Sequence, residues 1–368
     1  MVLTADIDLD SQEWTPIGDN NNPFRGNFDG RNHTISNLKV TDLDYAGLFG
    51  AISSKVATQT VKISNVKIKN VQISGANYAG ALAAYVRVYK GAGIQIDNCT
   101  VSGEVKGKDE IGGLLGFIYG GDHNSKIEIN SIISKVNISV SSSGSAGGIT
   151  GRIRCEDLNE NTYDGMISIK DCKYNGSVSG TNGGWIGGIA GRAEIDNQGE
   201  VVIQHCRAEG KLSFSSTGSA GGIAGELTGT NTKIISCVNY ATVAGKNYYS
   251  GGIAGRCMYG GFIDQCCNAG VIQNGVTGGD AGGITGWLQD GEIHNSYNIG
   301  YILRGTGTVS YVGGITGNNF GRIVNCYNAC PLPDRSTWTV VGAMGATTDG
   351  KTEYCYYDCI LYDEAHLY

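Results

Sequence analysis

A glycine-framed apolar pattern occurs ten times along the chain and constrains its fold more than any other feature. It reads G-[GA]-[ILA]-x-G in most copies and GLFG in the first. The copies occupy residues 47–50, 80–84, 112–116, 147–151, 187–191, 221–225, 251–255, 282–286, 313–317 and 341–345. Their last residues lie 28 to 40 positions apart in successive copies. A period in this range is typical of a stacked repeat protein.

Two short runs with the alternation of a β-strand follow most copies of the glycine pattern. The first run ends near a cysteine, as in IQIDNC from Ile94 and VVIQHC from Val201. The second run centres on one aliphatic residue, which in different copies is Val105, Val178, Leu212, Val243, Val271 or Ile302. Alternation bounded by Gly, Asn and Ser indicates strands. No window has the sustained i, i+3, i+4 apolar spacing of a long helix.

Three short strands with turns between them describe one coil of a parallel β-helix. A single coil cannot bury its apolar side, so neighbouring coils stack and pair their strands. The sequence therefore predicts an all-β fold, a right-handed parallel β-helix of about ten coils with three short strands per coil. We expect one continuous domain, with residues 1–46 as N-terminal cap and first coil, 47–345 as the repeats, and 346–368 as a C-terminal coil or cap.

Composition excludes several other classes of protein. Glycine accounts for 59 of 368 residues and proline for only 4, which excludes collagen. Charged residues make up 17% of the chain and the net charge is −7, so we expect no nucleic-acid partner. No apolar run is long enough to cross a membrane. The opening MVLTADIDLD is already strand-like, so we expect the chain to be a segment of a longer protein.

Seven of the 12 cysteines occupy the same place in successive repeats, and we predict that they form a ladder: Cys99, Cys172, Cys206, Cys237, Cys266, Cys326 and Cys355. Ser131 and Ser296 are expected to fill this place in two other repeats. Side chains one rung apart keep their Cβ atoms about 4.8 Å apart, whereas a disulfide needs about 3.8 Å. We therefore expect buried, reduced thiols and no metal or redox site. Cys330 and Cys359 are candidates for a second stack, and three cysteines fall outside it: Cys155, Cys257 and Cys267.

The repeat resembles the GLUG repeat, which is named for its Gly-Leu-(any)-Gly core, and GLFG at 47–50 fits that core closely. The segments DIDL at 6–9, WTPIG at 14–18 and FRGNFDGRNHTISNL at 24–38 are similar to the sequence that often precedes such repeats, and CYYD at 355–358 resembles their usual ending. The resemblance implies a large secreted or surface-anchored bacterial protein, such as an adhesin or a region beside a surface peptidase or carbohydrate-active module. It brings no catalytic motif.

One outward column is the best candidate for a ligand-binding face. The residue directly after the glycine pattern is, in successive coils, Phe117, Arg152, Arg192, Glu226, Arg256, Trp287 and Asn318. Binding residues concentrate where a rigid scaffold holds variable loops, and such loops follow this column. We predict that a bound ligand lies along Arg152, Arg192, Glu226, Arg256 and Trp287, flanked by Tyr119. The alternative is a solvated ladder in which arginine and glutamate relieve the repulsion between stacked charges.

Other candidate sites have weaker support. Glu226 with Asp196, or Asp157 with Glu194, could act as a glycosidase pair, but acidic loops on a solenoid offer such pairs by accident. The histidines occupy unrelated places in the repeat and predict no metal site: His33, His123, His205, His294 and His366. His205 shares an expected corner position, where Asn tolerates left-handed backbone, with Asn98, Asn130, Asn295 and Asn325.

The sequence thus predicts a non-catalytic extracellular module of a larger bacterial surface or secreted protein. Its role would be binding a glycan or a surface protein, or spacing, without a cofactor and without membrane insertion. The alternative is a carbohydrate-active enzyme, a glycosidase or polysaccharide lyase, on a β-helix scaffold. A lyase needs a basic groove beside an acidic sugar, and only the column Arg152, Arg192 and Arg256 hints at one.

Overall fold

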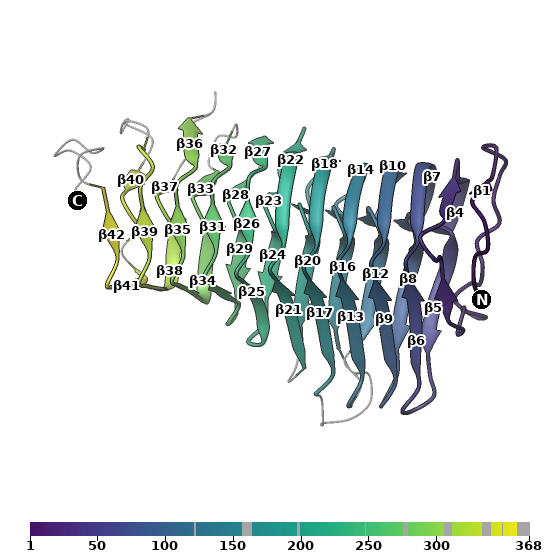
Figure 1. Cartoon of the computed structure of the whole chain (residues 1–368). Coiled ribbons are helices and arrows are strands. Elements are labelled where there is room, and N and C mark those ends of the chain that lie inside the picture. Colours follow the sequence, from purple (N-terminus) through teal and green to yellow (C-terminus); the bar gives the residue numbers. More distant parts are fainter. Residues whose placement is uncertain are drawn as a thin grey trace.

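The chain is a parallel β-solenoid of about nine turns. The computed structural model describes residues 1–120, 123–156, 164–196, 199–246, 248–274, 279–304, 311–332, 340–347 and 349–358. In these residues the regular structure consists of strands without helices, and all pairings between strands are parallel. The coils stack along one axis, with β1 (Ile7–Asp8) and β42 (Tyr356–Tyr357) near opposite ends (Figure 1). This architecture confirms the predicted parallel β-helix of about ten coils.

The first sheet has 18 strands in two columns. One column follows the glycine pattern: β5 (Phe49–Ser54), β8 (Ala83–Val88), β12 (Leu115–Gly120), β16 (Thr150–Cys155), β20 (Ala190–Ile195), β24 (Ala224–Thr228), β29 (Ala254–Met258), β34 (Thr285–His294) and β38 (Thr316–Val324). The other column precedes the cysteine ladder: β2 (Phe28–Asp29), β6 (Thr60–Ser64), β9 (Gly93–Asp97), β13 (Lys126–Asn130), β17 (Met166–Lys170), β21 (Glu200–Gln204), β25 (Thr232–Ile235), β30 (Phe262–Asp264) and β41 (Lys351–Glu353).

The second sheet has 24 strands. Its main column holds β1, β3 (Thr34–Ser36), β4 (Lys39–Ala46), β7 (Lys67–Gly80), β10 (Thr100–Gly107), β14 (Ile133–Val140), β18 (Lys173–Gly180), β22 (Arg207–Phe214), β26 (Val238–Asn239), β27 (Thr242–Gly245), β31 (Cys267–Asn268), β32 (Val271–Asn274), β35 (Tyr297–Asn298), β36 (Tyr301–Arg304), β39 (Tyr327–Asn328) and β42. A column of short strands holds β11 (Glu110–Gly112), β15 (Ser145–Gly147), β19 (Trp185–Gly187), β23 (Ser219–Gly221), β28 (Tyr249–Gly251), β33 (Asp280–Gly282), β37 (Tyr311–Gly313) and β40 (Val340–Gly342).

A central coil therefore has four strand segments rather than the predicted three. The additional segment is the three-residue strand that ends on the first glycine of each pattern, as β11 does at Gly112. The glycines form a sharp corner between the two sheets, where backbones of adjacent coils nearly touch. A Cβ on Gly148 would lie 2.1 Å from the carbonyl oxygen of Gly188, and one on Gly188 would lie 2.3 Å from that of Gly222. In these coils only glycine fits the corner, although Ala81 and Ala343 occupy the equivalent place in two other copies of the pattern.

The cysteine ladder lies in the core, but its occupants differ from the prediction at one coil. Asp97 pairs with Asn130 and Thr100 with Ile133, which places Cys99 beside Ile132 rather than Ser131. Ser131 is instead the corner residue, with φ of 56°, and Asn130 ends the preceding strand. The predicted corner position is confirmed for His205, whose φ is 52°. The sequence alignment placed Ser131 in the ladder because it matched polar side chains. The strand register instead matches buried apolar side chains, so Ile132 lies beside Cys99.

The seven ladder cysteines are free thiols, six of them buried and Cys355 partly so. Burial raises the pKa of the Cys206 and Cys237 thiols well above the usual range. Of the remaining cysteines, Cys155 and Cys257 are buried in the first sheet, and Cys359 lies outside the described residues. Because the thiolate is the reactive form, the six buried ladder thiols should resist labelling while the solenoid is folded. Cys355 should react first, because it is partly exposed and a hydrogen bond with Cys326 lowers its pKa to about 7.

Replacing Cys237 by serine is expected to change stability by less than about 1 kcal/mol. The Cys237 Sγ accepts a hydrogen bond from the Cys206 amide at 3.3 Å. In a neighbouring coil Ser296 Oγ performs the same task for the Cys266 amide at 3.0 Å. Cys237→Ala removes this acceptor and should destabilise more than Cys237→Ser in chemical denaturation. Equal losses in the two variants would mean that the acceptor does not matter.

A second internal ladder was not foreseen from the sequence. Four asparagines are fully buried in consecutive C-terminal coils: Asn239, Asn268, Asn298 and Asn328. Each of the first three donates from Nδ2 to Oδ1 of the next, at 2.8, 2.8 and 2.9 Å. The chain of amides satisfies polar groups that would otherwise be costly to bury.

Candidate functional site

The predicted column beside the glycine corner exists in the structure. Strand register aligns its members one above another in the order Phe117, Arg152, Arg192, Glu226, Arg256, Trp287 and Asn318. A second column faces it across the corner, two residues before the first glycine of each pattern: Tyr45, Tyr78, Glu110, Ser145, Trp185, Ser219, Tyr249, Asp280 and Tyr311. We call the two columns together the seam face.

Arginines of the seam face form an interleaved chain of ion pairs with Glu110 and Glu226 of the same face and with Glu194 of the neighbouring outward column. Arg152 Nη1 lies 3.0 Å from Glu110 Oε1, and its Nε donates to Glu194 Oε1 at 2.8 Å. Glu194 also pairs with Arg192, whose Nη2 lies 2.9 Å from Glu194 Oε2. Arg192 Nε donates in turn to Glu226 Oε1 at 2.7 Å. The alternation leaves each charge next to one of opposite sign.

Glu226 is the most enclosed member of this chain of ion pairs, with only 1% of its surface exposed. Its Oε2 pairs with Arg256 and accepts a hydrogen bond from Trp185 Nε1 at 2.8 Å. Two guanidinium groups lie near the Trp185 ring, that of Arg192 at 4.6 Å and that of Arg256 at 5.6 Å from its centroid. Cation–π contacts therefore continue the network from the charges into the aromatic residues.

Aromatic rings extend the seam face at both ends. Tyr78 stacks on Tyr45 at 5.2 Å and on Phe117 at 5.9 Å between ring centroids. At the other end Trp287 meets Tyr249 edge-on at 5.3 Å and Phe320 at 5.5 Å. Stacked rings cover much of one another's faces, so these contacts stabilise the stack itself.

Two donors of the seam face have no hydrogen-bond partner within the described part of the chain: Arg256 Nε and Trp287 Nε1. A hollow of about 190 Å³ lies nearby, beside Trp185, Tyr249 and Arg256. The column opposite also holds Asp280, only 3% exposed, and burial raises its pKa to about 7. These polar groups are all buried, so a ligand could engage them only after the side chains at this end of the seam face rearrange.

The remaining predicted residues do not converge on one site. Tyr119 lies on the neighbouring outward column, where the Arg87 guanidinium is 5.1 Å from its ring. Asp196 accepts a hydrogen bond from Arg154 at 3.2 Å, and Asp157 lies outside the described residues. The four described histidines each face a different carboxylate: His33 faces Asp6, His123 faces Asp164, His205 faces Asp171 and His294 faces Glu292. The described residues contain no group of three or more potential metal ligands.

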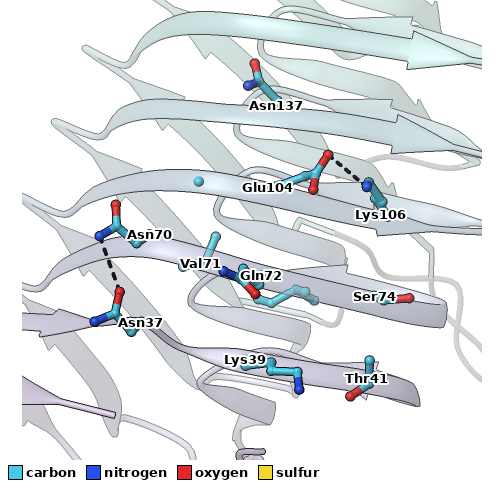
Figure 2. A pocket seen from close by; sticks show the side chains of 12 residues that line it. Asn37, Lys39, Thr41, Asn70, Val71, Gln72, Ser74, Glu104, Lys106 and Asn137 are labelled. Carbon is cyan, nitrogen blue, oxygen red and sulfur yellow. Dashed lines mark hydrogen bonds and ion pairs between the residues drawn. The ribbon is translucent and has the colours of Figure 1, made fainter. Parts of the chain in front are cut away.

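A polar groove opens on the outer face of the second sheet, in the N-terminal coils (Figure 2). It has a volume of about 740 Å³ and crosses β4, β7, β10 and β14. Its lining includes four amide side chains, Asn37, Asn70, Gln72 and Asn137. No motif in the sequence pointed to this groove, because it depends on how neighbouring coils align.

Comparisons with known proteins place the fold but not a family. No protein-family model matches the chain. The chain is 33% identical over 132 residues to halomucin from Haloquadratum walsbyi, a match that covers 32% of this chain and 1% of halomucin. It is similar, with a TM-score of 0.52 and 26% identity, to a crystal structure from Bacteroides ovatus described as a putative immunoglobulin A1 protease, over 67% of this chain and 70% of that one. In the described residues, no helix has the length and apolar character needed to span a membrane.

Proposed function

We propose that the chain is a non-catalytic extracellular binding or spacer module, of the GLUG-repeat type, in a larger bacterial surface or secreted protein. The observation that carries the proposal is the register of the stack. One outward side chain per coil is aligned with the next along the seam face and along the second sheet. Solenoids present extended binding surfaces in this way. A long ligand would meet similar groups on coil after coil.

Two further observations support a binding role over a lyase or glycosidase. The three arginines that hinted at a basic groove alternate with Glu110, Glu194 and Glu226, so their charges are compensated. The carboxylates themselves are held by guanidinium groups rather than facing each other as an acid–base pair. The halomucin match, at 1% of that protein's length, is consistent with coils of this kind forming a small part of a long chain.

The test is a panel of immobilised β-1,3-glucan, β-1,4-glucan, mannan, polygalacturonate, heparin and extracellular matrix proteins, read for retention and for new reducing ends. Specific retention without product supports a binding module. Unsaturated sugars or new reducing ends would instead support the carbohydrate-active enzyme, and no retention of any member would contradict the binding role. Loss of retention in Arg192→Ala, Trp287→Ala would place the ligand on the seam face. Tyr301→Ala is the matched control, since Tyr301 is a 59% exposed aromatic residue on the second sheet.

A further inference from the structure

We propose that the polar groove of the second sheet is the site for a neutral glycan chain, which lies along the solenoid axis across β4, β7, β10 and β14. This inference rests on the proposed binding function and assigns the ligand to a different face from the seam. The groove has a volume of about 740 Å³, against about 570 Å³ for a hollow that the seam residue Arg192 lines and about 190 Å³ for the hollow beside Trp185. Four arguments support it, from backbone geometry, free polar groups, charge and spacing.

A β-bulge shapes the groove. Val101 of β10 pairs with Ile68 of β7, and Gly103 pairs with Val71. Between these two pairs β10 has one residue, Ser102, whereas β7 has two, Lys69 and Asn70. Asn70 adopts a φ of 55° and Gly103 a φ of 132°. A Cβ on Gly103 would lie 2.3 Å from the Val71 nitrogen, so no side chain can fill this part of the sheet surface. Bulges re-aim side chains in this manner beside functional sites.

The amide groups of the groove are positioned but only partly engaged. Asn70 Nδ2 donates to Asn37 Oδ1 at 3.3 Å (Figure 2). Asn37 Nδ2 donates in turn to Asp8 Oδ1 at 2.7 Å. Asn137 Oδ1 accepts from the amide and the hydroxyl of Ser177 at 3.1 and 2.9 Å. Within the described residues, no hydrogen bond engages the Asn137 Nδ2 group or the exposed side chain of Gln72. Amides both donate and accept, which matches the hydroxyl groups of a sugar.

The charges that line the groove cancel locally. Lys106 Nζ lies 2.9 Å from Glu104 Oε1, and Lys39 Nζ lies 3.6 Å from Glu13 Oε2. An anionic glycan would therefore meet a carboxylate in the middle of the groove, and both lysines that line the groove are already paired with carboxylates. A neutral glycan meets no such repulsion, and its binding should depend little on salt.

Spacing along the axis favours an extended chain. Lys39, Gln72, Glu104, Asn137 and Ser177 form one outward column with one side chain per coil. Rungs about 4.8 Å apart are close to the repeat of an extended sugar chain. The lining has no Trp, Tyr or Arg, the residues that most often anchor protein partners, so a glycan would be held here through the amide and hydroxyl groups rather than by ring stacking. The seam face, by contrast, engages most of its donors internally.

The test uses the full chain, the same panel of neutral polysaccharides, anionic polysaccharides and matrix proteins, and the double variant Gln72→Ala, Asn137→Ala. We expect retention of a neutral polysaccharide, a Kd that is nearly constant between low and high salt, and affinity roughly tenfold weaker in the double variant. Asn175→Ala is the matched control, because Asn175 is an exposed amide one coil beyond the groove that donates to Glu209. It should bind as the unmodified chain does.

Each contrary result has a distinct meaning. Retention that persists in the groove variant but is lost in Arg192→Ala, Trp287→Ala would overturn the groove assignment and leave the proposed binding function intact. Salt-dependent retention of polygalacturonate or heparin alone would overturn the assignment to a neutral glycan. Retention of matrix proteins alone would overturn the glycan as ligand, and no retention at all would overturn this inference together with the binding function.

Discussion

Replacement of Glu226 by alanine is expected to destabilise the solenoid by about 3–5 kcal/mol, the usual cost of removing one partner from a buried ion pair. The change leaves Arg192 and Arg256 without the carboxylate between them and removes the acceptor of the Trp185 indole. Two arginine side chains on nearby coils would then repel each other where water has little access. The measurement is the midpoint and slope of chemical denaturation, followed by tryptophan fluorescence.

Glu104→Ala is the control for this prediction. Glu104 also makes an ion pair, with Lys106 at 2.9 Å, but both side chains are about half exposed. Exposed pairs contribute about 0–1 kcal/mol, so this variant should be close to the unmodified chain. If Glu226→Ala proved no more harmful than Glu104→Ala, the seam network would have to be regarded as an ordinary solvated charge ladder.

Asp280 should make the solenoid lose stability as the pH rises from about 4 to above 7. Burial raises the pKa of this carboxyl to about 7 in the folded chain, although a hydrogen bond from Asn318 opposes the shift. Because the unfolded chain titrates near pH 4, the folded state holds the extra proton between these values, and its advantage is lost as that proton leaves. The full effect is up to about 4 kcal/mol, since each pKa unit is worth about 1.4 kcal/mol.

Asp280→Asn removes the titrating group and should raise stability above pH 7 relative to the unmodified chain. The expected signature is a flatter curve of unfolding free energy between pH 4 and 8. Asp44→Asn serves as control because Asp44 is exposed and accepts only a hydrogen bond from Asn77. A pH dependence that survives in Asp280→Asn would show that other groups govern it, such as Glu110, whose carboxyl pKa is also raised by burial.

The solenoid and its period were predictable because each coil repeats the same corner glycines and the same buried cysteine or aliphatic residue. The seam column that contains Arg152 and Arg192 was predictable for the same reason, since it directly follows the glycines. The opposite column, with Trp185 and Tyr249, was missed although it always lies two residues before the first glycine. Its strands have three residues, too few for a strand to reveal itself through alternation.

Two other features could not be obtained from a periodic pattern. The one-residue error at Ser131 arose because similarity of side chains was used where only hydrogen-bond register decides which residues are neighbours. The groove depends on the extra residue near Asn70, which becomes visible only when β7 is laid against β10. An extra residue in one strand can be recognised only by comparing that strand with its partner in the next coil. The pattern of a single repeat does not contain this information.

The alternation of charge along the seam also limits how repeats of this chain can be gained or lost. Recombination between similar repeats tends to delete or duplicate whole units, and the glycine corners would tolerate either event. Arg152 and Arg192 are already neighbours in register, and both pair with Glu194. Deletion of the coil that carries Glu226 would bring Arg192 against Arg256 and remove the carboxylate that both engage, whereas duplication of that coil would stack two glutamates on adjacent rungs. The number of coils can therefore change only where the ion pairs between neighbouring coils are kept. Natural length variants should retain Arg192, Glu226 and Arg256 on three consecutive coils.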